Sequence, residues 1–307
     1  MTGPRPAVYS TPGFPTDVRV YEVGPRDGLQ AEATLVPTHV KVRFIKELAE
    51  AGLPVVEATS FVSPKWVPQL SDAAEVLAEL GDLTSHPVLV PNMRGLERAR
   101  ESGAKSVAVF VSATETFARK NLNMSRASAC ETAMEVVAEA IKRGMTARGY
   151  LSMCFGDPWE GPVGKDTVAE VSRQLLDAGC YEISLGDTIG VATAGHVKAL
   201  IDEHVQGGVP LERLALHFHD TYGQALSNVL AGLQAGITCF DASTGGIGGC
   251  PFAGSATGNL AMEELLWLLH GLGISTGVDL DAVVRAGQTI TDLLGRRPSR
   301  IAQAMAG

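Results

Sequence analysis

Two histidines separated by one residue stand at the end of a short apolar run, in His217-Phe218-His219. Side chains two apart on a strand share a face, so both imidazoles point to one side, about 6–7 Å apart. This spacing lets them bind one divalent metal ion without rearranging the backbone. An isolated pair of this kind is more often a hydrogen-bonded or surface pair. Here Asp220 follows directly, and other candidate ligands stand where strands are expected to end, which favours a metal site.

These other polar side chains follow different β-rich runs along the chain. They are Arg26, Asp27 and Gln30 after the first run, Glu57 at the end of the second, Asp187 after the sixth, and Cys250 and Asn259 after the eighth. Any one of them has an ordinary explanation, because Asp and Asn often form turns or cap helices. They form a site only if the fold brings the ends of these runs to one place.

The pattern of elements predicts such a fold. An amphipathic helix, a small residue with glycine, and a short β-rich run recur along the chain, as at Ala51-Gly52 and Ala178-Gly179. Glycine ends a helix with little strain because it adopts the left-handed conformation. The expected strands are 18–23, 55–57, 88–90, 107–111, 150–151, 183–185, 214–218 and 237–240. Helices of roughly 10–20 residues alternate with them, for example over 38–51, 163–178 and 222–235.

Eight alternating units in about 250 residues predict an α/β fold, a parallel (β/α)8 TIM barrel. Extra C-terminal helices are expected over 260–269 and 280–294. We expect residues 1–16 to form a flexible N-terminal arm and residues 17–307 to form a single catalytic barrel. Two smaller α/β domains are the alternative, although no Pro/Gly/Ser-rich linker interrupts the middle of the chain. In such a barrel the carboxyl ends of all strands meet on one rim, where active sites lie.

The composition excludes several classes of protein. The 307 residues carry a net charge of −9, which argues against a nucleic-acid partner. No apolar run reaches the length of a membrane span, and the first residues lack a signal or transit pattern. Five cysteines without paired metal-type spacing indicate reduced thiols. We therefore expect a cytoplasmic protein without nucleic-acid or membrane partners.

The candidate ligands suggest which metal the site would bind. Asp27, His217, His219 and the amide oxygen of Asn259 offer two nitrogen and two oxygen ligands. Without a thiolate, and with room for two further oxygens, this set suits octahedral Mg²⁺ or Mn²⁺ better than structural zinc. The open positions suit a substrate that chelates through a hydroxyl and a carbonyl or carboxylate.

The neighbouring residues suggest the reaction. Arg26 adjoins Asp27 and has the charge to stabilise a developing enolate. Asp187 and Glu57 are candidates for a general base or for support of the metal ligands. This chemistry suits making or breaking a carbon–carbon bond beside a carbonyl.

From about Val18 to Gln303, the sequence resembles the hydroxymethylglutaryl-CoA lyase family, within the metal-dependent lyase and Claisen-type barrel group. The resemblance rests on the set of segments and on no single short motif. The segments are EVGPRDGLQ (22–30), EATSFVSPKWVP (57–68), SLGDTIG (184–190), HFHDTYGQA (217–225) and GGIGGCP (245–251).

The resemblance implies cleavage of 3-hydroxy-3-methylglutaryl-CoA to acetyl-CoA and acetoacetate, with an acyl-CoA as partner molecule and a role in leucine degradation. We also expect a homo-oligomer, either a dimer or a tetramer. By this resemblance, the cation is bound by Asp27, His217, His219 and Asn259, and Arg26 stabilises the enolate. Asp187, with His217 nearby, removes the hydroxyl proton, and Cys250 protonates the carbanion. Glu57 and Glu263 orient the substrate or support the ligands, and Gln30 supports the loop after the first strand.

Three other functions are considered. The first is the same cleavage of a different branched 3-hydroxyacyl-CoA, since Asp157-Pro158-Trp159-Glu160 departs from the family pattern. The second is a condensing synthase that makes isopropylmalate or homocitrate, but such synthases tend to carry Glu where Leu29 stands. The third is a non-catalytic metal-binding scaffold, which would need none of Arg26, Asp187 and Cys250.

Overall fold

The computed structural model describes residues 5–249 and 258–306. In this part of the chain nine parallel strands form one sheet, ordered β2-β1-β9-β8-β7-β6-β5-β4-β3. The strands are β1 (Arg19–Glu22), β2 (Val55–Val56), β3 (Thr59–Ser60), β4 (Val88–Leu89), β5 (Ser106–Ser112), β6 (Thr146–Ser152), β7 (Ile183–Asp187), β8 (Leu214–Phe218) and β9 (Cys239–Ala242).

The two edges of this sheet are β2 and β3, which follow one another in the chain. Between them, the backbone N–H of Glu57 donates to Glu22 in β1, and that of Ala58 donates to Pro87 beside β4. The sheet therefore closes into the predicted barrel. The expected strand at 55–57 is replaced by two short strands, because this segment changes its partner from β1 to β4 where the barrel closes.

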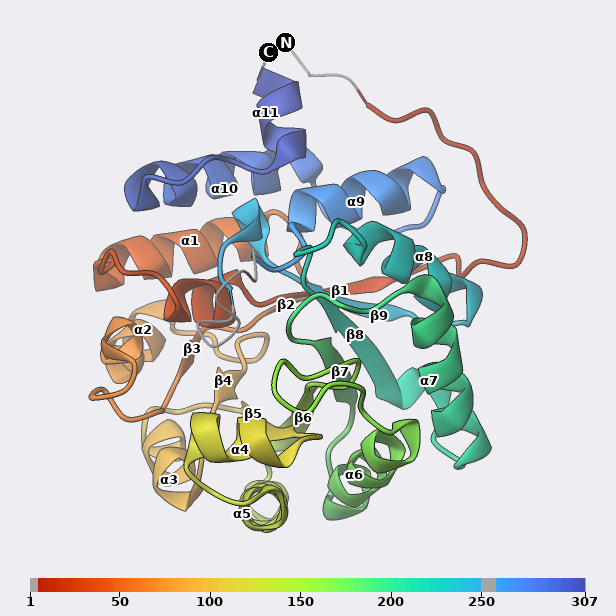
Figure 1. Ribbon diagram of the computed structural model, residues 1–307. Helices are drawn as coiled ribbons and strands as arrows, with labels where there is room; N and C mark the ends of the chain where they lie inside the picture. The colour runs from red at the N-terminus through yellow and green to blue at the C-terminus, as the bar shows by residue number, and fades with distance from the viewer. Residues whose placement is uncertain (1–4, 250–257, 307) are drawn as a thin grey trace.

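Helices surround the strands, as Figure 1 shows. They are α1 (Thr38–Glu50), α2 (Ala73–Leu80), α3 (Met93–Glu101), α4 (Glu115–Leu122), α5 (Arg126–Lys142), α6 (Lys165–Ala178), α7 (Ala194–Gln206), α8 (Ala225–Gln234), α9 (Met262–Gly271), α10 (Leu280–Leu294) and α11 (Arg300–Ala306). The C-terminal helix α10 packs on α1 and α9, and α11 packs on α9 and α10. The extra C-terminal helices are thus confirmed.

Element boundaries differ from the expected ones where a turn intervenes. The helix expected from residue 222 begins at Ala225, because Asp220 to Gly223 form a turn in which Gly223 has a φ of 68°. In contrast, α10 spans the expected 280–294, since the side chain of Asp279 caps its first turn. Helix α11 was not predicted from the sequence.

The large apolar core lies between the sheet and the helices. Leu216 and Phe218 of β8 point into it, whereas Ala215 points into the barrel, where it packs with Tyr21 and Val23. The alternation predicted for the strand that carries the histidines is confirmed. It follows that His217 shares the inner face with Ala215.

The barrel interior also holds a buried arginine, Arg148 of β6, which is 0% exposed. Its guanidinium donates to Asp241 of β9 and to Glu182, and it lies over the ring of Tyr21 at 3.9 Å. A buried charge is costly unless it is paired in this way. The interior is therefore a polar network directly beneath the rim.

The segment before β1 carries no helix or strand over residues 5–18. The N–H of Tyr9 donates to Gly271 at the end of α9, and Arg5 forms an ion pair with Asp281 of α10. The flexibility expected for residues 1–16 stays a prediction. Among the described residues, no helix combines the length and apolar character needed to cross a membrane.

Candidate metal centre

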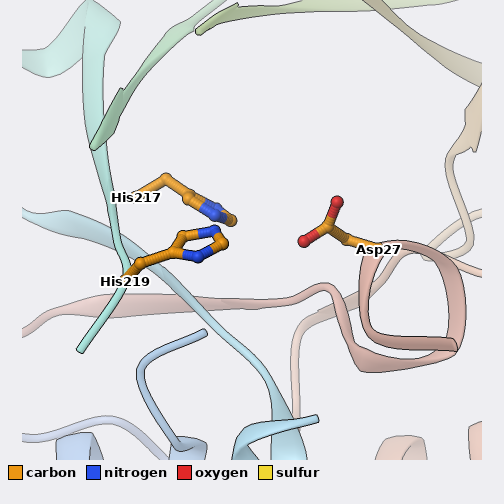
Figure 2. A group of neighbouring side chains, drawn as sticks. All are labelled: Asp27, His217 and His219. Carbon is orange, nitrogen blue, oxygen red and sulfur yellow. The ribbon is translucent and has the colours of Figure 1, made fainter. Parts of the chain in front are cut away.

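The end of β8 presents both histidines to one side. His217 lies in β8 and His219 just after it, and their rings stand 5.3 Å apart. Asp27 faces them from the loop after β1, as Figure 2 shows. Ligand atoms of Asp27, His217 and His219 all lie within 4.8 Å of one another. The structure therefore brings together these three residues, all of them predicted to bind metal.

A single π-helical turn, Gly24–Gly28, holds Asp27 in this position. The backbone N–H groups of Asp27 and Gly28 both donate to the carbonyl of Val23, at 2.7 and 3.1 Å. Pro25 suits the start of the turn, because proline lacks a backbone N–H and the first position of a helical turn needs no such donor. The carboxylate projects from a compact turn with a fixed backbone.

Asn259 is the fourth predicted ligand, and its amide is already oriented. Its Nδ2 donates to Asp27 Oδ2 at 2.9 Å and to the carbonyl of Ile247 at 3.1 Å. Its Oδ1 is buried and has no hydrogen-bond partner within the described part of the chain. Because Nδ2 is occupied, Oδ1 is the atom left to bind a cation. A backbone bridge between His219 and Asn259 keeps this residue beside the histidines.

Further buried polar atoms lack a hydrogen-bond partner within residues 5–249 and 258–306. They include Glu57 Oε1, Thr59 Oγ1, His217 Nδ1, His219 Nδ1, Ser243 Oγ and Asn259 Oδ1. Buried polar groups are rarely left unpaired without a functional reason. Of these atoms, His219 Nδ1 and Asn259 Oδ1 belong to predicted ligands and fit a divalent cation, whereas His217 Nδ1 faces Asp241.

The charges of Asp27 and His219 suit a cation, whereas at His217 the carboxylates of Asp241 and Asp27 outweigh burial and raise the pKa. Burial alone would raise the pKa of Asp27, but Arg26 and the two imidazoles outweigh it and hold that pKa below its ordinary value. Burial and the neighbouring imidazole lower the pKa of His219 to about 4. Asp27 is therefore anionic and His219 neutral at neutral pH, the forms in which both bind metal.

Arg26 lies beside the centre, held by two carboxylates. Its Nε donates to Glu57 Oε2 and its Nη1 to Asp27 Oδ1, both at 2.8 Å. Glu57 is fully buried and also accepts from the hydroxyl of Tyr150 at 3.0 Å. Glu57 thus holds the guanidinium of Arg26, and its supporting role in the reaction stays a prediction.

Asp187 ends β7 and is buried. Its two oxygens accept from the backbone N–H groups of Val191 and Ala192, at 2.9 and 3.1 Å. Burial outweighs these bonds and raises its pKa to about 7. Each carboxylate oxygen has a second lone pair, so Asp187 keeps the capacity to accept a proton. Its role as a base stays a prediction.

Of the remaining predicted residues, the structure describes Gln30 and Glu263. Gln30 is exposed on the turn after Gly28. Glu263 is fully buried, and both of its oxygens accept from the N–H of Gly245 at 3.0 Å, so it holds the loop after β9. Cys250 lies outside the described residues. Asp220 pairs with Arg300 of α11 and caps the turn before Ala225.

The sequence reasoning missed the residues that support the site from inside the barrel. Arg148, Asp241 and Tyr150 were not singled out, although they connect to His217 and to Glu57. A signal was present, since Arg148 and Asp241 are charged residues next to expected strands. Charged residues in such positions are rarely buried unless they are paired.

Glu263 leads to a prediction about stability. Burial raises its pKa from 4.5 to about 8. A group whose pKa is raised by folding contributes stability that is fully present below its unfolded pKa and is lost as pH rises through the folded one. The free energy of unfolding should therefore fall between about pH 4.5 and pH 8 by up to roughly 1 kcal/mol per pH unit from this group.

Urea unfolding of wild type and Glu263→Gln across this pH range measures the effect. Glutamine keeps the size of the side chain and removes the ionisation. The variant should lose less stability than wild type as pH rises. Parallel curves for the two proteins would contradict the prediction.

Comparisons with known proteins agree with this geometry. Residues 17–290 match the family model described as HMGL-like. The chain is 51% identical to the mitochondrial hydroxymethylglutaryl-CoA lyase of Bos taurus, over 95% of this chain and 90% of that protein. It is 50% identical to the cytoplasmic 3-hydroxy-3-methylglutaryl-CoA lyase of Danio rerio, over 95% of this chain and 88% of that protein. The crystal structure of hydroxymethylglutaryl-CoA lyase from Pseudomonas aeruginosa has a TM-score of 0.92 and 49% identity, covering 96% of this chain and 99% of the other.

Proposed function

The chain belongs to the HMGL-like family, and from this premise we propose that it is a divalent-metal-dependent carbon–carbon lyase that cleaves 3-hydroxy-3-methylglutaryl-CoA to acetyl-CoA and acetoacetate. The observation that carries the proposal is the cluster of Asp27, His217 and His219 on the barrel rim, beside the guanidinium of Arg26. The choice of substrate is supported by the 51% sequence identity to the hydroxymethylglutaryl-CoA lyase of Bos taurus.

In this proposal the cation is Mg²⁺ or Mn²⁺, held by Asp27, His217, His219 and Asn259. Nitrogen and oxygen donors without a thiolate favour these ions over structural zinc. When bound, such an ion supplies positive charge that stabilises negative charge on oxygen.

The residues of this chain then have separate tasks. Asp187 takes the proton of the tertiary hydroxyl, and the carbon–oxygen bond becomes the ketone carbonyl of acetoacetate as the carbon–carbon bond breaks. The electron pair of that bond passes to the acetyl-CoA fragment as an enolate. Arg26 stabilises the enolate by charged hydrogen bonds, with Glu57 holding its guanidinium in place. Cys250 donates the proton that converts the enolate to acetyl-CoA.

An assay of acetoacetate release on a panel of 3-hydroxyacyl-CoA thioesters tests the proposal. We expect 3-hydroxy-3-methylglutaryl-CoA to give the highest kcat/KM and excess chelator to abolish turnover. Faster cleavage of another branched thioester would favour the first alternative and would give Asp157-Pro158-Trp159-Glu160 a part in acyl-group selection. No cleavage of any thioester, with metal present, would refute the proposed activity.

The compartment and assembly of the protein stay predictions. Relatives at about half identity include both a mitochondrial and a cytoplasmic enzyme. The cytoplasmic location, the part in leucine degradation and the dimer or tetramer expected from the sequence belong to the proposal only.

A further inference from the structure

A buried carboxylate lies behind one of the two clustered histidines. Asp241, the third residue of β9, is the register partner of His217 in β8. Its Oδ2 lies 3.5 Å from His217 Nδ1, and Asp241 is 1% exposed. This nitrogen has no formed hydrogen bond to any described residue. Asp241 is thus the charged group that faces the inner side of this imidazole.

Asp241 is itself held from two sides. Arg148 donates to it through both terminal nitrogens, at 2.7 Å to Oδ1 and 3.1 Å to Oδ2. The hydroxyl of Ser184 in β7 donates to Oδ2 at 2.6 Å. A bidentate arginine–carboxylate pair fixes direction as well as charge. The carboxylate therefore has a single orientation relative to His217.

Arg148 is immobilised in turn. Its Nε donates to Glu182 at 2.7 Å, and the rings of Tyr21 and Tyr150 lie 3.9 and 4.9 Å from its guanidinium. Such packing leaves Arg148 no alternative rotamer without a large loss of buried contacts. The chain of contacts thus runs from β6 through β9 to the rim.

We propose that Asp241 is a positioning residue that selects the tautomer and orientation of His217, with Nδ1 protonated toward the barrel interior and Nε2 free for a cation. A neutral imidazole carries one proton, and a carboxylate beside one nitrogen keeps the proton there. Metal-binding histidines are commonly oriented by such a partner. The separation of 3.5 Å exceeds a formed hydrogen bond by a few tenths of an ångström, and contacts of this kind often tighten when a ligand binds. This inference rests on the metal centre of the proposed function.

The tautomer is measurable in the wild-type protein without metal. Long-range proton–nitrogen spectra of the chain labelled with ¹⁵N-histidine, recorded where the imidazoles are neutral, report which ring nitrogen carries the proton. The His217 signals are identified by their absence in His217→Gln. We expect protonated Nδ1 at His217. Protonated Nε2 would overturn the inference, and this measurement requires no variant of Asp241 to fold.

Mn²⁺ affinity, measured by titration calorimetry, gives the second test. Asp241→Asn keeps the shape of the side chain but offers His217 a donor, which favours the wrong tautomer. We expect the dissociation constant to rise about 10–100-fold, the usual effect of removing the partner of a metal-binding histidine. The matched control is Glu182→Gln, which removes an equally buried carboxylate charge but keeps an acceptor for Arg148 Nε, so that Arg148 still holds Asp241 beside His217.

The outcomes separate this inference from the metal centre on which it rests. Weaker Mn²⁺ binding in Asp241→Asn with near wild-type binding in Glu182→Gln supports the positioning role. Equal loss in both variants, or no loss in Asp241→Asn, overturns it and leaves the metal centre intact. If wild type binds no Mn²⁺ at all, both the inference and the metal centre fail.

Discussion

His219→Ala is expected to raise the dissociation constant for Mn²⁺ at least about 100-fold and to abolish most turnover, since loss of a ligand should exceed loss of a supporting partner. His219 is one of two imidazoles in the cluster with Asp27, and it is neutral at neutral pH. It lies beyond the end of β8 on the rim. Metal binding should therefore suffer far more than folding.

The chain offers a control with the same substitution. His204 is also fully buried, but its ring contacts Ser172 and the carbonyl of Leu200, between α6 and α7. His204→Ala should lower the melting temperature and leave Mn²⁺ affinity near that of wild type. Calorimetric titration and thermal unfolding of both variants measure the contrast. Unchanged Mn²⁺ affinity in His219→Ala, or full activity of wild type in excess chelator, would contradict the proposed centre.

Arg26→Met is expected to lower kcat by at least about 100-fold with a smaller change in KM, the scale of losing one electrostatic stabiliser of a transition state. Methionine retains much of the volume and removes the charge. The guanidinium stands between Asp27 and Glu57, so it is fixed before substrate binds. An oriented charge of this kind acts mainly on the transition state.

Removing Arg26 also takes one partner from the buried Glu57, which keeps only the hydroxyl of Tyr150 among the hydrogen bonds described here. Tyr150→Phe is the matched control, because it takes the other partner from Glu57 and leaves the Arg26 charge. Its kcat should fall much less than that of Arg26→Met. Steady-state kinetics of both variants decide the point. A raised KM with unchanged kcat in Arg26→Met would mean that Arg26 only binds the thioester.

The sequence by itself determined the elements whose pattern is local. Helix α10 spans the residues predicted for it, 280–294, because the apolar period that indicates a helix is a local signal. The alternation in β8 placed His217 and His219 on one face for the same reason. Once eight units indicated a closed barrel, the meeting of strand ends on one rim followed, and with it the approach of Asp27 to both histidines.

Only the tertiary structure decided which buried groups pair with one another. Arg148 and Asp241 are 93 residues apart in sequence, and the parallel register between β8 and β9 sets Asp241 opposite His217. In the same way, Glu263 holds Gly245 instead of facing the clustered ligands. No local sequence pattern identifies these pairs, because the sequence around a charged residue does not show whether its side chain is solvent-exposed or buried beside a partner. Burial makes a partner necessary, and the barrel supplies it by bringing Arg148 of β6 and Asp241 of β9 together in its interior.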